Sequence, residues 1–283
     1  MTASGFTVLL SPTTNSDVFA ANRATGHIEL SVAETAGITR RKDVHEDGSL
    51  RVRFPNCAGA GLEAVIVNTA GGMAGGDRFG IALSVGAGAS LAAGTAAAEK
   101  VYRSTGAAAE VRLRLDIGEG ARLSWLPQET ILFDHARLSR HIDVDLAENA
   151  SLVMAEAVIF GRAAMGETME QGLLADRWRL RRGGRLVFAE GVRLDGAIAE
   201  KLGRQAAAAG GIAIGTVLVA PGTEEVVAAV RAFDKQFAGE VGISTWNGIA
   251  VARFCAMDGA ALRHDLVSVL AALGQPLPRL WTN

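Results

Sequence analysis

Alternation of apolar and polar residues recurs along most of this chain and constrains its fold more than any other feature. In residues 111–117, valine, leucine and isoleucine alternate with arginine and aspartate, and residues 142–146 follow the same pattern. A period of two puts the apolar side chains on one face of an extended segment, which is typical of a half-buried β-strand. Glycine is frequent, with 34 residues, whereas there are only 6 prolines. Many glycines with few prolines favour tight turns between short strands, so we predict a mainly β fold.

These strands are organised by a faint repeat. In each unit an alternating strand is followed by a turn and then by an Ala/Gly-x-Leu triplet that begins a second strand. The triplets begin at Ala89, Ala121, Ala150 and Gly184. Units of about 30 residues are typical of hairpin-sized elements stacked side by side, each burying its apolar face on the next. The fourth unit contains Gly183-Gly184 between two alternating runs, which predicts a β-hairpin.

The last quarter of the chain has a helical pattern instead. Thr223 can cap a helix in which apolar residues recur every three or four positions up to a stop at Gly239. Asp258 can cap a second helix, which Gly274 and two nearby prolines end. Residues 249–255, between the two helices, predict a strand.

Composition and charge narrow the class of function. No linker separates an independent domain, so we predict a single domain over residues 1–283, with residues 1–20 as a mobile N-terminal segment. The net charge of −2 supplies no basic surplus for nucleic acid or an anionic membrane, and no apolar run approaches the ~18 residues of a membrane span. Cys57 and Cys255 lie far apart, and the histidines form no dense ligand pattern. We therefore predict no disulfide framework, no stable metal site and a reducing, cytoplasmic location.

The most unusual segment is a glycine-rich loop that ends in an acid. Its residues of interest are Gly71, Gly72, Gly75, Gly76 and Asp77. It is not a Walker loop, because no Gly-Lys-Ser/Thr ends it, and it is not a dinucleotide loop, because the residues that follow predict a strand. Asp77 would also repel a phosphate. Two interpretations remain: tight turns that need positive φ angles, or a rigid loop that places Asp77 at an exposed or channel-facing site.

This loop also resembles a known family. Residues 71–77, Gly-Gly-Met-Ala-Gly-Gly-Asp, are similar to the signature of the urease accessory protein D family (UreD). Four further motifs resemble the same family in the family's order: residues 99–104, residues 125–131 with Phe133, residues 161–167 and residues 277–281. A single motif would be a weak signal, but five in order over nearly the whole chain make a chance resemblance improbable.

The resemblance implies both a fold and a function. The fold would be a long, coiled β-structure of many short strands with two α-helices near the C-terminus. The function would be that of a non-catalytic scaffold, which binds apo-urease and accessory protein F and, through F, the nickel-carrying GTPase G. No cofactor would be bound stably, and nickel would be in transit. An internal nickel passage has been proposed for the family, and its acidic positions correspond here to Asp77, Glu156 and Glu190.

Isolated carboxylates suit a passage of this kind. Nickel is a borderline divalent ion that accepts oxygen and nitrogen ligands. A protein that hands the metal on must bind it weakly, so separate carboxylates and water serve better than a closed cage of cysteine and histidine.

The family motifs also contain side chains that are candidates for contacts with the partner proteins. They are Lys100, Tyr102, Arg103, Gln128, Glu129, Arg162, Met165 and Glu167. Simpler interpretations stay open. Lys100 and Arg103 can lie on a solvated face. Gln128 and Glu129 can cap a turn, and the glycine-bounded loop around Met165 can cover the core.

Two other classes of function also stay open. One is an enzyme for a small substrate that uses Asp77 or Glu129 as a general base beside the glycine-rich loop. The other is a generic β-scaffold for protein assembly unrelated to nickel. The sequence contains no nucleophile elbow, no H-E-x-x-H motif and no close group of His, Asp and Ser. We therefore favour a binding protein over an enzyme and predict no catalytic residue.

Overall fold

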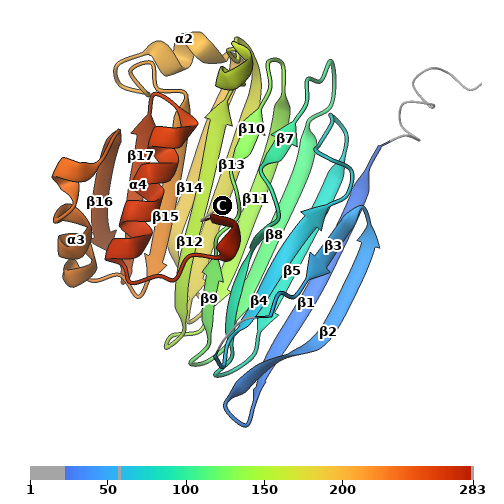
Figure 1. Ribbon diagram of the computed structural model, residues 1–283, viewed down its shortest axis with the longest axis vertical. Helices are drawn as coiled ribbons and strands as arrows, with labels where there is room; N and C mark the ends of the chain where they lie inside the picture. The colour runs from blue at the N-terminus through green and yellow to red at the C-terminus, as the bar shows by residue number, and fades with distance from the viewer. Residues whose placement is uncertain (1–22, 57–58, 282–283) are drawn as a thin grey trace, which may run out of the picture.

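Two β-sheets dominate the structure, a computed structural model that describes residues 23–56 and 59–281 (Figure 1). The seven-stranded sheet contains β1 (Thr25–Thr35), β2 (Ile38–Gly48), β5 (Arg78–Val85), β8 (Ala109–Ile117), β11 (Arg137–Leu146), β13 (Gln171–Arg182) and β14 (Arg185–Ala197). The ten-stranded sheet contains β3 (Leu50–Arg53), β4 (Leu62–Asn68), β6 (Ser90–Thr95), β7 (Glu99–Val101), β9 (Arg122–Trp125), β10 (Thr130–Leu132), β12 (Ser151–Phe160), β15 (Ala213–Ala220), β16 (Glu240–Trp246) and β17 (Ile249–Ala256). The helical elements are α2 (Ile198–Gly203), α3 (Glu224–Arg231), α4 (Gly259–Ala272) and the 3-10 turns η1 (Ala163–Met165), η2 (Asp234–Gln236) and η3 (Arg279–Trp281). The expectations for residues 1–20 and Cys57 lie outside the described residues.

From β5 to β13 the chain passes repeatedly from one sheet to the other. After β5 in the first sheet the chain enters β6 in the second, and the same step recurs from β8 to β9 and from β11 to β12. Within each sheet these strands are parallel neighbours. The leucines of the first three triplets, Leu91, Leu123 and Leu152, lie directly opposite one another and are buried. This β-solenoid-like arrangement confirms the prediction of a long, coiled, mainly β fold.

In the first three repeat units the two strands do not pair with each other, a point that the hairpin-sized spacing left open. A hairpin would place both strands of a unit in one sheet, whereas β5 and β6 lie in different sheets, as do the corresponding pairs. Alternation cannot distinguish the two arrangements, because both strands bury their apolar faces in the same core between the sheets. The fourth unit does form the predicted hairpin: Gly183 and Gly184, both at positive φ, join β13 to the antiparallel β14.

The second predicted helix is confirmed as α4. Asp258 caps it by accepting a hydrogen bond from the Ala261 amide at 2.8 Å. The predicted strand between the helices is also confirmed, as β17. α4 lies across β15 and β17 and, with α3, forms a second apolar core on this sheet (Figure 1). The helix α2 was not expected, because six residues are too few to show a helical period.

The helix predicted from Thr223 to Gly239 is shorter than expected. Thr223 caps α3 by accepting a hydrogen bond from an amide of the first turn, but α3 ends at Arg231. The buried carboxylate of Asp265 in α4 accepts hydrogen bonds from the amides of Ala238 (2.7 Å) and Gly239 (2.8 Å). A continuous helix would use those amides internally, so these bonds favour the break. None of the described helices has the length and apolar character needed to cross a membrane.

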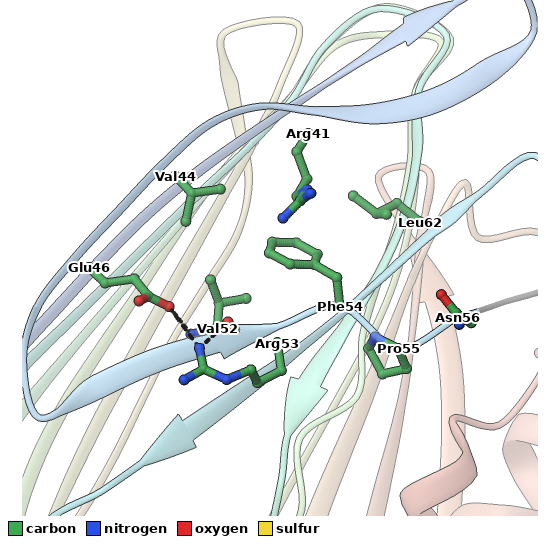
Figure 2. Close-up of a pocket in the computed structure, with 9 residues that line it drawn as sticks. All are labelled: Arg41, Val44, Glu46, Val52, Arg53, Phe54, Pro55, Asn56 and Leu62. Carbon is green, nitrogen blue, oxygen red and sulfur yellow. Dashed lines mark hydrogen bonds and ion pairs between the residues drawn. The ribbon is translucent and has the colours of Figure 1, made fainter.

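The two sheets end beside each other. In the described part of the chain, β2 is the last strand of the seven-stranded sheet and β3 is the last strand of the ten-stranded sheet. A groove lies between these two edges, with Arg41, Val44 and Phe54 among its lining residues (Figure 2).

Candidate functional site

Three charged side chains are buried between the two sheets. They are Arg140 of β11, Glu156 of β12 and Asp176 of β13, which are 6%, 6% and 9% exposed. The Arg140 guanidinium donates to both oxygens of Asp176, at 3.1 and 2.5 Å, and also to Glu156. Asp176 is the direct neighbour of Arg140 in its sheet, whereas Glu156 belongs to the other sheet. The cluster therefore connects the two sheets through the core.

This cluster carries an excess of negative charge. It has two carboxylates for one guanidinium. Burial raises the pKa of Glu156, against the opposing effects of Arg140 and of the Trp125 indole, which donates to Glu156 at 2.7 Å. Burial alone would lower the pKa of Arg140, but the charges of Asp176 and Glu156 outweigh it and raise that pKa. Arg140 therefore stays charged, and the remaining negative charge attracts a proton or a further cation.

Glu190 of β14 lines the same cavity as this cluster. The cavity has a volume of about 40 Å³, and Arg140, Glu156, Asp176 and Glu190 are among its lining residues. Arg253 of β17 donates to both oxygens of Glu190, to one of them at 2.8 Å. The structure thus brings together two of the three acidic positions predicted for a nickel passage, and each is paired with an arginine.

A wider groove adjoins this cavity on the outside. It has a volume of about 500 Å³ and shares Glu190, Val192 and three residues of β15 with the cavity. It adds Glu240 and Cys255. Burial raises the pKa of the Cys255 thiol, and the charge of Glu240 raises it further. The carboxylates thus form a series from the buried Glu156, through Glu190, to Glu240 in the groove.

Sequence reasoning missed Arg140 and Asp176, although the alternation contains a signal for both. In β11, Arg140 is in phase with the buried residues Leu138 and Ile142. In β13, Asp176 is in phase with the buried Trp178. A charged residue at a buried position needs a charged or hydrogen-bonding partner, so the pattern could have marked both positions.

Asp77, the third predicted position, is not among the residues that line the cavity. It is 4% exposed, and its carboxylate accepts hydrogen bonds from the amides of Ala24 (2.9 Å) and Ala74 (2.6 Å). These bonds fasten the glycine-rich loop to the chain that enters β1. Each amide left unpaired would cost about 1–3 kcal/mol. A loss of function on substitution of Asp77 would therefore report on the loop as well as on any contact with nickel.

The glycines of this loop are required for two different reasons. Gly71, Gly72 and Gly76 have φ angles of 76°, 148° and 90°, which confirms the interpretation as turns that need positive φ. Gly75 differs, because its φ lies outside the left-handed region. A Cβ atom there would lie 1.9 Å from the Oγ of Ser104, so Gly75 is required by close approach to the next motif.

The motif at residues 99–104 packs against the loop. The Tyr102 hydroxyl donates to the Gly71 carbonyl at 2.7 Å, and the Tyr102 ring meets the Phe133 ring edge-on, with centroids 5.2 Å apart. Lys100 and Arg103 are exposed. Tyr102 therefore has partners within the chain, while Lys100 and Arg103 remain predicted partner contacts.

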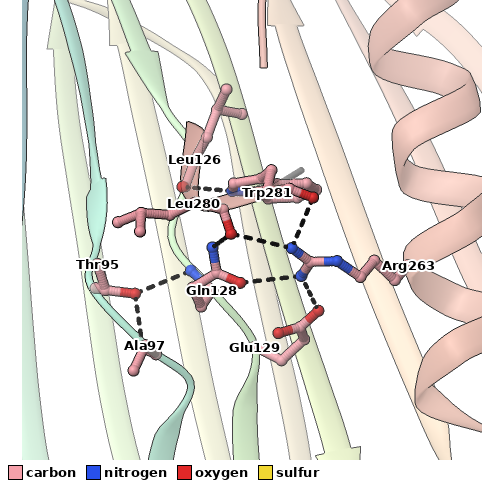
Figure 3. Close-up of polar contacts among 8 residues, drawn as sticks. All are labelled: Thr95, Ala97, Leu126, Gln128, Glu129, Arg263, Leu280 and Trp281. Atoms are coloured by element: carbon pink, nitrogen blue, oxygen red, sulfur yellow. Dashed lines mark hydrogen bonds and ion pairs between the residues drawn. The ribbon is translucent and has the colours of Figure 1, made fainter. Parts of the chain in front are cut away.

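The motifs at residues 125–131 and 277–281 meet at Arg263 of α4 (Figure 3). Arg263 donates to the side chains of Gln128 (2.9 Å) and Glu129 (2.6 Å) and to the carbonyl of Trp281 (3.0 Å). The Trp281 indole donates to the carbonyl of Leu126 at 3.0 Å. Gln128 and Glu129 thus fasten the C-terminal turn to the sheet, and their role as partner contacts stays a prediction. Arg263 had no signal in the sequence, because its partners are remote along the chain.

The motif at residues 161–167 forms a small turn after β12. Arg162 pairs with Glu167 at 2.6 Å, and its guanidinium lies 4.1 Å from the centroid of the Phe133 ring. The hydrogen bond from Arg162 lowers the pKa of Glu167. Met165 is 73% exposed. An exposed methionine on a braced turn suits an adaptable protein contact, so these three residues remain predicted partner contacts.

The fold and these side chains define the class of the molecule: a solenoid-like β-protein with a charged internal cavity. Within residues 23–56 and 59–281, no three His, Cys, Asp or Glu side chains are grouped so that they could hold a metal ion. The charged residues of the cavity occur instead as arginine–carboxylate pairs.

Comparison with known proteins gives the family. The family model described as UreD urease accessory protein matches residues 24–282. The urease accessory protein UreD of Rhodopseudomonas palustris (strain HaA2) is 60% identical over 268 residues, which cover 94% of this chain and 96% of that protein. Its counterpart in Bradyrhizobium diazoefficiens is 59% identical over 268 residues, with 95% and 97% covered. The chain therefore belongs to the UreD urease accessory protein family, which confirms the resemblance and places it among accessory proteins rather than named enzymes.

Proposed function

We propose that this chain is a non-catalytic scaffold of urease maturation in the cytoplasm, and that nickel crosses it as cargo. In this proposal the chain binds apo-urease and accessory protein F and, through F, the GTPase G. Membership of the UreD family supports the maturation role. The observation that carries the nickel role is the cavity in which Glu156, Asp176 and Glu190 lie together between the sheets.

The chemistry of this cavity suits transit better than storage. Nickel accepts carboxylate oxygens, so Glu156 and Glu190 can replace water in its coordination shell. A cavity of about 40 Å³ holds about one water, so a hydrated ion must shed water to enter unless the cavity widens. The carboxylates are already paired with Arg140 and Arg253, and an incoming dication must compete with these guanidinium groups. Such competition weakens binding, which favours release toward urease.

Asp77 has a different part in the proposal. Each of its oxygens accepts a backbone hydrogen bond and the residue is 4% exposed, so its carboxylate is already engaged within the loop. The role that its geometry supports is to fix the glycine-rich loop.

The two alternatives have less support. A general base needs an accessible carboxylate, but Asp77 is held by two amides and Glu129 is paired with Arg263. A generic β-scaffold unrelated to nickel would bind partners other than urease, and substitution of the cavity carboxylates would not change its function.

The maturation role predicts a stable complex that can be isolated. An affinity-tagged full chain, expressed with the urease subunits and accessory proteins F and G, is expected to retain all of them. Deleting the chain is expected to reduce urease activity to background. The measurement is the protein content of the purified complex, together with urease activity in cells with and without the chain. Failure to recover urease, combined with normal urease activity without the chain, would contradict the proposal.

A further inference from the structure

The groove at the open end of the two sheets has a mixed apolar and basic lining that the nickel passage does not use. It has a volume of about 670 Å³. Val44, Val52, Phe54 and Leu62 supply apolar surface, and Val44 is 41% exposed. Arg41 approaches the Phe54 ring from β2, with the guanidinium carbon 4.7 Å from the ring centroid (Figure 2). A guanidinium stacked on a ring keeps its in-plane N–H donors available for a carboxylate.

A β-bulge directs Arg41 into this groove. Opposite the step from Ser31 to Val32 in β1, the partner in β2 changes from Asp43 to Arg41, so Lys42 is an extra residue. Arg41 and Val44 are three residues apart, so regular alternation would place them on opposite faces of β2. The extra residue places both on the same face. Without the bulge, the groove would lose its stacked arginine.

The positive charge of the groove is not neutralised within the described part of the chain. Glu46 is its carboxylate, and it is engaged with β3: it accepts a hydrogen bond from the Val52 amide at 2.5 Å and lies 3.5 Å from Arg53. Arg41 makes no ion pair among the described residues, and neither do Arg40 and Lys42, which are exposed beside it. Among the residues that the structure describes, the groove therefore offers one unpaired guanidinium, that of Arg41, next to apolar surface, with Arg40 and Lys42 exposed on the same strand.

The two strand edges at the groove differ in what they can accept. Glu46 occupies the Val52 amide of β3, which blocks that edge at this point. The outer edge of β2 pairs with no other strand in the described part of the chain, and at its start the Thr39 amide donates to the Ala60 carbonyl at 2.8 Å. The part of this edge beyond Thr39 is a template for an added strand. A second copy of β2 paired in parallel and in register would bring Arg40, Arg41 and Lys42 against like charges, which disfavours that arrangement.

We propose that the edge of β2 and the adjoining groove bind an extended segment of a partner protein, with alternating acidic and aliphatic side chains. The backbone of this segment would continue the seven-stranded sheet beyond β2. Its carboxylates would meet Arg41 and its neighbours, and its aliphatic side chains would cover Val44 and Phe54.

Fluorescence anisotropy of a labelled peptide of alternating glutamate and valine tests this inference with the full chain. Saturable binding with a Kd below about 1 mM is expected, and Arg41→Glu should weaken it at least about tenfold. Arg41→Gln, which only removes the charge, should have a smaller effect in the same direction, and it keeps the test valid if Arg41→Glu fails to fold. The matched control is Arg185→Glu on β14, an exposed arginine at the opposite edge of the same sheet, which should bind like the unmodified chain.

Several results would overturn the inference. One is absence of binding at about 1 mM peptide. Others are equal binding of an alternating lysine–valine peptide, equal weakening by Arg185→Glu, or retention of tight binding in both Arg41 variants. Equal binding of polyglutamate would show adsorption of any polyanion. Self-association of the chain that Arg41→Glu abolishes would show that a second copy occupies the groove.

Discussion

Replacing Arg140 with methionine is expected to destabilise the protein by about 3–5 kcal/mol at neutral pH, because it leaves buried carboxylates without their counter-charge. Methionine fills much of the same volume, so the loss reports mainly on charge and hydrogen bonding. Glu156 would keep its bond from Trp125, but Asp176 would lose both of its bonds from Arg140. The measurement is the free energy of unfolding in urea.

The destabilisation should depend on pH. Burial already raises the pKa of Glu156, and Arg140 opposes that effect, so its removal raises this pKa further. A carboxyl whose pKa is higher in the folded state binds its proton more tightly there. The stability that this carboxyl contributes is therefore fully present when the pH is below its pKa in the unfolded state, about 4.3. It is lost as the pH rises through the pKa of the folded state. The difference between the Arg140→Met variant and the unmodified chain should thus be largest at neutral pH and shrink on acidification.

A triple variant provides the control for this prediction. Arg140→Met combined with Glu156→Gln and Asp176→Asn removes all three charges while keeping the shapes similar. It should recover most of the lost stability, because replacing a whole buried ionic cluster is far less costly than removing one partner. An Arg140→Met variant as stable as the unmodified chain would show that the cluster is open to water.

Replacing Trp281 with alanine is also expected to cost about 3–5 kcal/mol, since it empties a large buried site. Trp281 is 6% exposed and packs in the second core, between the ten-stranded sheet and α4. Its indole donates to the Leu126 carbonyl, and Arg263 lies 5.1 Å from its ring centroid. Urea unfolding at neutral pH measures the effect.

Trp281→Phe is the matched variant, because it keeps most of the packing and loses the indole hydrogen bond. Its cost should be close to that of one hydrogen bond with some loss of contact, about 1–2 kcal/mol. If Trp281→Ala lowered the free energy of unfolding by less than about 1 kcal/mol, packing of Trp281 would not hold the C-terminal turn in place.

The strands of this fold could be predicted from the sequence, but their distribution between two sheets could not. The triplets that contain Leu91, Leu123 and Leu152 recur about every 30 residues, and this spacing correctly predicted stacked units, because these leucines lie opposite one another. Whether a turn reverses the chain within one sheet or carries it to the other depends on turn geometry. Either route buries the same apolar face, so only the Gly183-Gly184 turn, with both residues at positive φ, was predictable as a hairpin.

The candidate site was predictable in part. Family resemblance selected Glu156 and Glu190, which the structure places at one cavity, while the phase of Arg140 within β11 was a signal that went unused. The contacts of Gln128 could not be predicted, because its partner Leu280 comes 152 residues later in the sequence. Local patterns carry no information about contacts made when a chain end returns to the sheet.

Passage of nickel through the cavity can be tested by the nickel content of urease matured with the double variant Glu156→Gln/Glu190→Gln. Glutamine keeps the size of each side chain and removes its charge, and Glu200→Gln, an exposed residue of α2, is the matched control. With equal amounts of complex recovered, we expect at least about a tenfold fall in nickel per urease active site for the double variant, and none for the control. Normal nickel content with the folded double variant would contradict passage of nickel through this cavity.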